Sequence, residues 1–108
     1  MTFDVLESRL ADAVINGIGN IVLSNGIDVM RADLRRGVEF VGEYGATGEL
    51  RDRITVRRQD AALFERGMVI EADPATYTPA ELLAMPRTSW TLDRMADDNG
   101  HLVSWWLR

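Results

Sequence analysis

The chain has 108 residues, of which 46% are hydrophobic and 27% charged, and its net charge at pH 7 is −5. This length is typical of one domain with a single core, and the composition is too apolar for a disordered chain. There is no cysteine, which excludes disulfides and thiolate chemistry, and all 12 basic residues are arginines scattered along an acidic chain. We therefore expect no electrostatic binding to nucleic-acid backbones. We also expect neither a signal peptide nor a membrane span.

The first segment predicts an amphipathic helix over residues 3–16. Phe3, Leu6 and Leu10 repeat at three- and four-residue spacing, while charged residues occupy the other face. Thr2 is suited to cap its start, and Gly17 ends it. Such a helix is expected to cover another part of the fold.

After residue 19 the hydrophobic period changes from that of a helix to that of strands. The stretch 20–34 contains an Asn25-Gly26 pair between two apolar runs and predicts a hairpin. Residues 38–41 indicate a weak strand, 42–49 a loop, and 54–57, 66–72, 89–95 and 101–108 further strands. We expect one domain over 1–108, mainly β with an N-terminal α-helix, as a small β-barrel or sandwich over 20–108.

An insertion over residues 73–88 interrupts these strands. Thr78, followed by Pro79 and Glu81, is the pattern of a capping box with proline at the first helical position. The pair Met85-Pro86 ends the segment, because the residue before a proline disfavours helical geometry. A short helix is therefore predicted here.

The stretch 95–106, MADDNGHLVSWW, contains two acids, the only histidine and a tryptophan pair. Asn99-Gly100 favours a two-residue hairpin loop in which both residues take positive φ. That loop would place Arg94 opposite Trp105. It would also pair Leu92 with Leu107 and Ala96 with Val103, and it would put one set of apolar side chains on a single face: Trp90, Leu92, Val103, Trp105 and Leu107.

Catalytic and metal-binding interpretations find little support. His101 has no second histidine or cysteine to share a metal, and no serine carries the signature of a nucleophile. The glycine-bearing stretches 16–20 and 42–49 lack the spacing of dinucleotide-binding and phosphate-binding loops. We expect no enzyme activity, no cofactor and no metal.

The adjacent Trp105 and Trp106 must point to opposite faces of a strand. With Trp105 inside, Trp106 is either covered by the N-terminal helix or the insertion, or left for a partner. Tyr44, in the centre of the long loop, and Arg51 and Arg53 just beyond it would suit contact with another protein.

Two stretches of the C-terminal half carry a resemblance to a known family. The first, ITVRRQDAALFERGMVI, places an acid after a strand and a Leu-x-x-x-Gly step before the next strand. The second, WTLDRMADDNGHLVSWWLR, joins two strands through an acidic glycine turn. This order resembles the small head–tail joining proteins of lambda-like, long-tailed bacteriophages, which are similar in combining a small β-barrel with a helix.

The resemblance implies a structural virion protein that joins the portal end of a DNA-filled head to the tail. It implies an oligomeric ring at the head–tail junction, assembled in the host cytoplasm, with portal or head connector proteins on one side and a tail terminator or tail-tube protein on the other. DNA would pass through without specific binding, since an acidic wall repels it. Candidate assembly-interface residues are Tyr44, Arg51, Arg53, Tyr77, Leu82, Leu83 and Trp106.

Two alternatives remain open at this point. One is a tail terminator or other tail-tube completion protein, which the same resemblance allows. The other belongs to a different class, a β-barrel that binds a small ligand or a nucleotide, supported only by the glycine-bearing loops.

Overall fold

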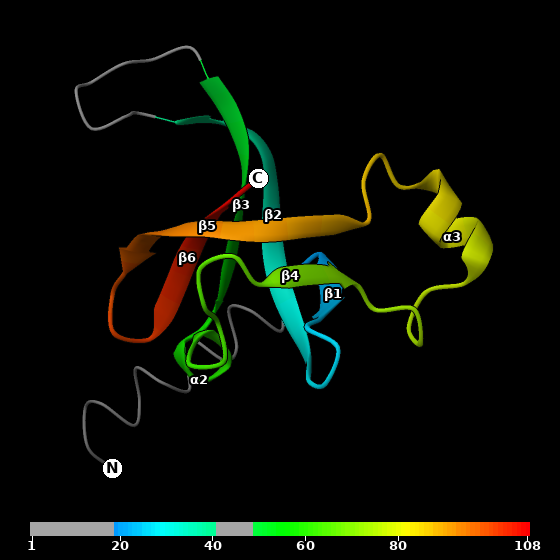
Figure 1. Cartoon of the computed structure of the whole chain (residues 1–108), viewed down its shortest axis with the longest axis horizontal. Coiled ribbons are helices and arrows are strands. Elements are labelled where there is room, and N and C mark those ends of the chain that lie inside the picture. The colour runs from blue at the N-terminus through cyan, green and yellow to red at the C-terminus, as the bar shows by residue number, and fades with distance from the viewer. Residues whose placement is uncertain (1–18, 41–48) are drawn as a thin grey trace.

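The computed structural model describes residues 19–40 and 49–108, and its strands form a closed antiparallel barrel (Figure 1). The strand order around the barrel is β1-β2-β3-β6-β5-β4, and β4 pairs back onto β1. Closure gives each of the described strands a paired neighbour on both sides. The prediction of a mainly β fold with a barrel is thus confirmed, and the elements are β1 (Ile21–Ser24), β2 (Val29–Phe40), β3 (Glu49–Arg57), α2 (Arg58–Ala61), β4 (Val69–Ala72), α3 (Pro79–Ala84), β5 (Ser89–Asp98) and β6 (Leu102–Leu107).

The interior of the barrel is a packed hydrophobic core. Alternate residues of each strand point inward, which is the period that a half-buried strand requires. Beyond α2, Phe64 adds an aromatic ring that meets Trp105 edge-on, with ring centroids 6.2 Å apart. The buried hydrophobic side chains are Ile21, Leu23, Met30, Ala32, Leu34, Ile54, Val56, Phe64, Ile70, Ala72, Trp90, Leu92, Val103, Trp105 and Leu107.

Strand β2 differs from the sequence prediction. The weak strand expected over 38–41 is not separate, because β2 runs without interruption from Val29 to Phe40. Its register against β3 shifts between Arg35 and Val38, and Gly37 there has φ +64°. The one extra residue of β2 is absorbed as an irregularity within the strand, and glycine accepts the positive φ without strain.

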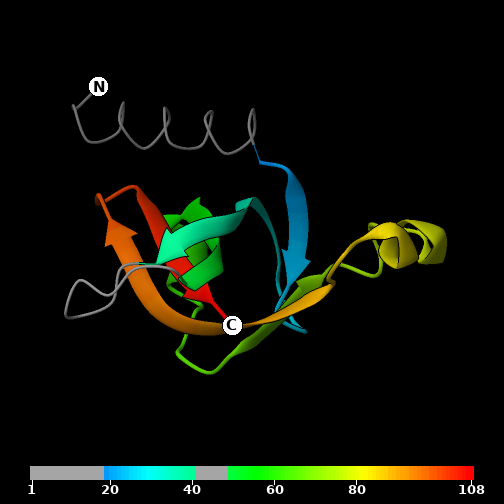
Figure 2. The same cartoon turned by 90° about the horizontal axis from the view of Figure 1, so that it is seen from above.

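The insertion contains the predicted short helix, α3. Thr78 accepts a hydrogen bond from the Glu81 amide, and the Glu81 side chain accepts one from the Thr78 amide, so the capping box is present. Pro79 begins the helix and Met85 caps its end in extended geometry. Figure 2 shows that α3 projects away from the barrel on the connection between β4 and β5.

Two sequence predictions lie outside the described residues: the helix over 3–16 and the position of Tyr44. Within the described ranges, neither short helix has the length or the apolar character needed to cross a membrane.

Candidate functional site

The outer face of β3 and β6 carries a contact between an arginine and a tryptophan. Arg53 and Trp106 are opposite each other in the β3–β6 register, and the Arg53 guanidinium lies 5.6 Å from the centre of the Trp106 ring. Trp105 is buried inside the barrel and Trp106 is half-buried on the outside. The prediction that the tryptophan pair divides between two faces is therefore confirmed.

This contact is the centre of a longer row of outward positions. Arg35 of β2 pairs with Arg53, and Arg94 of β5 pairs with Trp106, so four strands contribute one residue each. We call these four residues, Arg35, Arg53, Trp106 and Arg94, the arginine–tryptophan row. Arg35 also binds Asp33 of its own strand, with 3.1 Å between Nε and Oδ2.

Sequence reasoning found only the middle of this row. Arg35 and Arg94 are distant in sequence from Arg53 and belong to other predicted strands, so nothing local connects them. The only available signal was their odd or even place within each strand, and the register shifts in β2 and β5 weaken that signal.

Arg51 has a different environment from Arg53, although the two lie on the same face of β3. Its Nε is 2.9 Å from Glu49, and its Nη1 donates a hydrogen bond to Asp93 of β5. The hydrogen bond to Glu49 is the largest cause that raises the pKa of Arg51 above its ordinary value; desolvation opposes it, and the hydrogen bond to Asp93 adds to the rise. Arg66 approaches the same Asp93 carboxylate at 4.0 Å.

These contacts give Arg51 a role within the barrel. Its side chain is only 22% exposed, and Asp93 is 11% exposed, so the ion pair is largely shielded from water. Because it bridges β3 to β5 across β6, it helps to hold three strands together. Arg51 and Arg53, which the sequence treats as one candidate pair, are thus separated by their contacts.

The candidate residues of the insertion also divide into two kinds. The Tyr77 hydroxyl accepts a hydrogen bond from the Val22 amide of β1 at 2.9 Å, and Leu82 packs against the core. Leu83, on α3, is 87% exposed. Tyr77 and Leu82 therefore anchor the insertion to the barrel, whereas Leu83 is available to a partner.

Tyr77 occupies a place where the ladder between β1 and β4 ends. The paired residues of that ladder stop at Leu23 and Ala72. Beyond them, the Val22 carbonyl accepts from the Asp73 amide and the Val22 amide donates to Tyr77. The phenol thus satisfies a backbone donor that has no strand partner.

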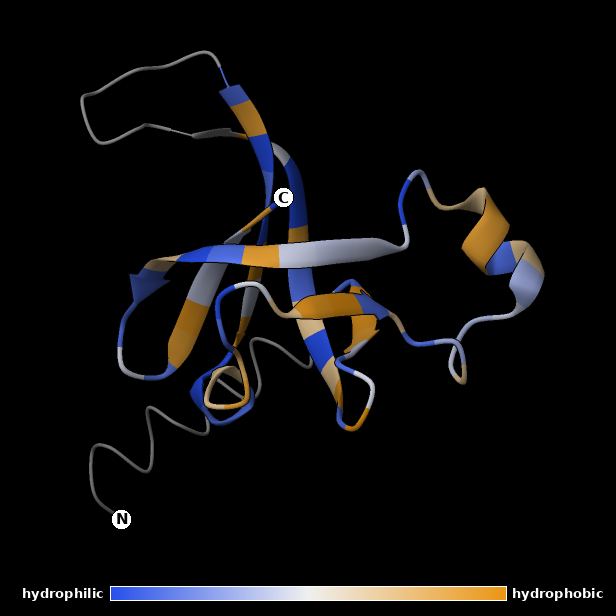
Figure 3. Ribbon diagram, in the orientation of Figure 1, coloured by the Kyte–Doolittle hydropathy of each residue, from blue (hydrophilic) through white to orange (hydrophobic). Residues whose placement is uncertain are grey.

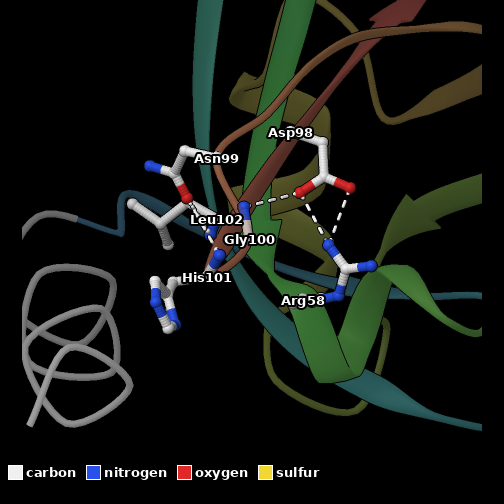
Figure 4. Close-up of polar contacts among 6 residues, drawn as sticks. All are labelled: Arg58, Asp98, Asn99, Gly100, His101 and Leu102. Atoms are coloured by element: carbon white, nitrogen blue, oxygen red, sulfur yellow. Dashed lines mark hydrogen bonds and ion pairs between the residues drawn. The ribbon is translucent and has the colours of Figure 1, made fainter. Parts of the chain in front are cut away.

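The turn between β5 and β6 is held by local hydrogen bonds (Figure 4). The Asn99 Oδ1 accepts from the amides of His101 and Leu102, and an Asp98 oxygen accepts from the Gly100 amide at 2.8 Å. Both Asp98 oxygens also accept from Arg58 at 2.8 Å. The Gly100 amide, followed by Arg58, lowers the pKa of Asp98 below its ordinary value.

The predicted register of this hairpin is wrong between Arg94 and the turn. Leu92 does pair with Leu107, but Arg94 pairs with Trp106 instead of Trp105. Of the two loop residues, only Gly100 has positive φ, at +93°. The turn closes with the Asn99 amide bonded to the Leu102 carbonyl, one position later than predicted.

The physical reason is that local hydrogen bonds of the turn make Asn99 and Leu102 its closing pair. The Asn99 side chain accepts from the amides of His101 and Leu102, which favours an Asx-type turn over positive φ at Asn99. Two irregularities in β5, after Leu92 and after Met95, absorb the displacement. The pairing of Ala96 with Val103 is lost, and Asp98 lies opposite Val103 instead. The predicted inward set survives, since all five of its members are buried.

No group of three or more potential metal ligands of the His, Cys, Asp or Glu type occurs within residues 19–40 and 49–108. A surface depression of about 440 Å³ lies between β2 and the insertion. Its walls include Arg35, Arg36, Tyr77 and Met85.

Comparison with known proteins does not assign the chain to a family. No protein-family model matches the sequence, and no similar sequence is found among curated proteins. The fold and the outer face described above therefore define the protein as a closed six-stranded β-barrel with a basic and aromatic row on one side.

Proposed function

We propose that this protein is a structural component of a bacteriophage particle that joins the DNA-filled head to the tail. The proposal rests on the resemblance of the segments 54–70 and 90–108 to small head–tail joining proteins of lambda-like phages. In it the protein forms a ring at the portal end of the head and receives the tail on the opposite side.

The observation that best supports a structural role is the location of the candidate contact residues. The barrel interior is filled with side chains, while Arg53, Trp106 and Leu83 lie on its outside or on the projecting insertion. Tryptophan and arginine are the residues most enriched at protein–protein contacts. A solid barrel with such surfaces is suited to binding other proteins on several sides.

The charge is consistent with a passage for DNA. A net charge of −5 repels phosphate, so DNA can slide past such a ring without being held. We propose that the neighbours are portal or head connector proteins, a tail terminator or tail-tube protein, and other copies of this chain.

The ligand-binding alternative would have to use the surface depression beside Arg35 and Arg36, whose guanidinium groups suit a small anion. A ligand that binds the native state stabilises it, so the midpoint of thermal unfolding should rise with ligand concentration. A library of nucleotides and phosphorylated metabolites provides the probes. A saturable rise would favour the ligand-binding class.

The test of the joining role is electron microscopy of lysates from a phage or prophage in which this gene is disabled. We expect DNA-containing heads beside separate tails of normal length, and whole particles when the purified protein is added. Intact virions would refute the joining role. Tails of uncontrolled length would instead assign the protein to the tail-terminator class.

A further inference from the structure

Two outer surfaces with opposite character lie on opposite sides of the barrel. The arginine–tryptophan row is centred on β3 and β6, and β2 and β5 separate these strands from β4 and β1 on the other side. Figure 2 shows β1 and β6 on opposite sides of the barrel.

That second surface combines exposed valines with a carboxylate. Ser24 of β1 pairs with Val29 on one side and with Glu71 on the other, so these residues share one outer row. Val29 and Val69 are each 56% exposed. We call Val29, Val69 and Glu71, together with Ile27 and Asp28 of the adjoining turn, the valine–glutamate patch.

The patch is apolar in the turn between β1 and β2 as well as along its strands. Ile27 is 91% exposed, and Figure 3 shows strongly hydrophobic positions in β4 and in the turn between β1 and β2. Exposed aliphatic side chains gathered beside acidic groups are a common form of interaction surface.

The two surfaces are complementary in charge. Within the described part of the chain, Arg53 makes no ion pair, and its guanidinium lies over Trp106. Glu71 likewise has no ion-pair partner there. Arg53 is opposite Arg35 in the register, and because Arg35 already binds Asp33, Arg53 is the cation of this pair that an incoming carboxylate would meet.

From this complementarity we propose that the arginine–tryptophan row of one copy binds the valine–glutamate patch of a second copy. Trp106 covers the valines, and Arg53 meets Glu71. Because the two surfaces differ and lie on opposite sides, the contact is heterologous, and repeating it closes a ring when the rotation between copies permits. The inference deepens the proposed function, on which it rests, by assigning the subunit contacts of the ring.

Cross-linking tests the geometry directly, because the natural chain has no cysteine. Asp97→Cys places a thiol beside the row, since Asp97 pairs with Ser104 in the outer row next to Trp106. Ser89→Cys places one beside the patch, since Ser89 pairs with Glu71. Ala80→Cys on exposed α3 is the matched control.

The variants are made in two mass-distinct forms, concentrated and treated with a short bismaleimide. We expect the mixture of Asp97→Cys and Ser89→Cys to give linked pairs at least about tenfold more often than either mixture with the control. Each variant by itself should link no more than the control does. Links within one variant alone would indicate a symmetric, isologous contact and would overturn the proposal, as would an absence of selective links.

Charge exchange tests the residues in the same cross-linking assay. Arg53→Glu or Glu71→Arg alone should weaken the association about tenfold or more, because each places like charges together. The chain that carries both substitutions should regain part of the loss, since the opposite charges then meet in exchanged positions. Circular dichroism verifies that each variant is folded. A double variant no better than the worse single variant would refute the assigned contact.

The outcome is separable from that of the proposed function. If the protein restores whole phage particles but gives no selective links, the subunit contact is wrong and the joining role stands. If selective links form and the gene proves dispensable for joining heads to tails, the contact stands and the joining role is wrong.

Discussion

The barrel contains two buried tryptophans that differ mainly in one hydrogen bond. Trp90 is 1% exposed, its Nε1 donates to Asp52 at 2.9 Å, and the Arg87 guanidinium lies 5.9 Å from its ring centre. Trp105 is 8% exposed, and its Nε1 has no partner among the described residues. Replacing each tryptophan by phenylalanine therefore compares a paired indole with an unpaired one.

Both substitutions remove the same atoms, so the loss of buried ring and the space left behind contribute similar amounts to each. The difference is the hydrogen bond to the Asp52 carboxylate, and a bond to a charged group contributes about 1.5–3 kcal/mol. Because Asp52 is half-buried, water can replace part of the hydrogen bonding that its carboxylate loses in Trp90→Phe. We therefore expect Trp90→Phe to lower the free energy of unfolding by about 1.5 kcal/mol more than Trp105→Phe does.

The measurement is urea unfolding followed by circular dichroism, which does not depend on the tryptophans that remain. A difference of this size corresponds to about 6 °C or more in the midpoint of thermal unfolding. Asp52→Asn in the natural background is the control, because it keeps an acceptor oxygen and removes the charge. We expect it to lower the free energy of unfolding by less than Trp90→Phe does. The reasoning is refuted if Trp105→Phe is as destabilising as Trp90→Phe.

Three further predictions follow from the contacts of single side chains. Arg51→Glu should lower the free energy of unfolding by roughly 1–3 kcal/mol, because the new carboxylate repels the acids that Arg51 now binds. Arg53→Glu should leave the free energy of unfolding of the isolated chain within about 1 kcal/mol of the natural value. Equal losses in urea unfolding would contradict the division of roles between the two arginines. Tyr77→Phe leaves the Val22 amide without its acceptor and should cost about 1 kcal/mol, and hydrogen exchange at that amide should accelerate; unchanged exchange would show that the phenol does not protect it. Because its pKa is lowered on folding, Asp98 stabilises the fold above about pH 4 and loses this effect as the pH falls through the folded pKa. A carboxyl titration by NMR should give a midpoint below that of a free aspartate, and a midpoint at or above it would contradict the assigned contacts.

Patterns that depend on near neighbours were sufficient for much of the architecture. Alternating apolar residues predict the strands, because a half-buried strand repeats every second residue. The Asn25-Gly26 turn and the capping box at Thr78 also follow from residues a few positions apart, and the structure contains both. The absence of cysteine shows that the fold does without disulfides, so the composition predicts a hydrophobic core as its main support.

Contacts between distant residues were decided only by the tertiary structure. The strand order, with β6 between β3 and β5, brings Arg51 to Asp93 and Trp90 to Asp52, which are 42 and 38 residues apart. Irregularities in β2 and β5 shift the register, and a shift of one residue changes which side chains are opposite each other. The sequence by itself therefore determined which residues face inward, because that depends on local period. The arginine–tryptophan row and the patch across from it required the closed barrel, because their members meet only when strands from separate parts of the chain pair side by side.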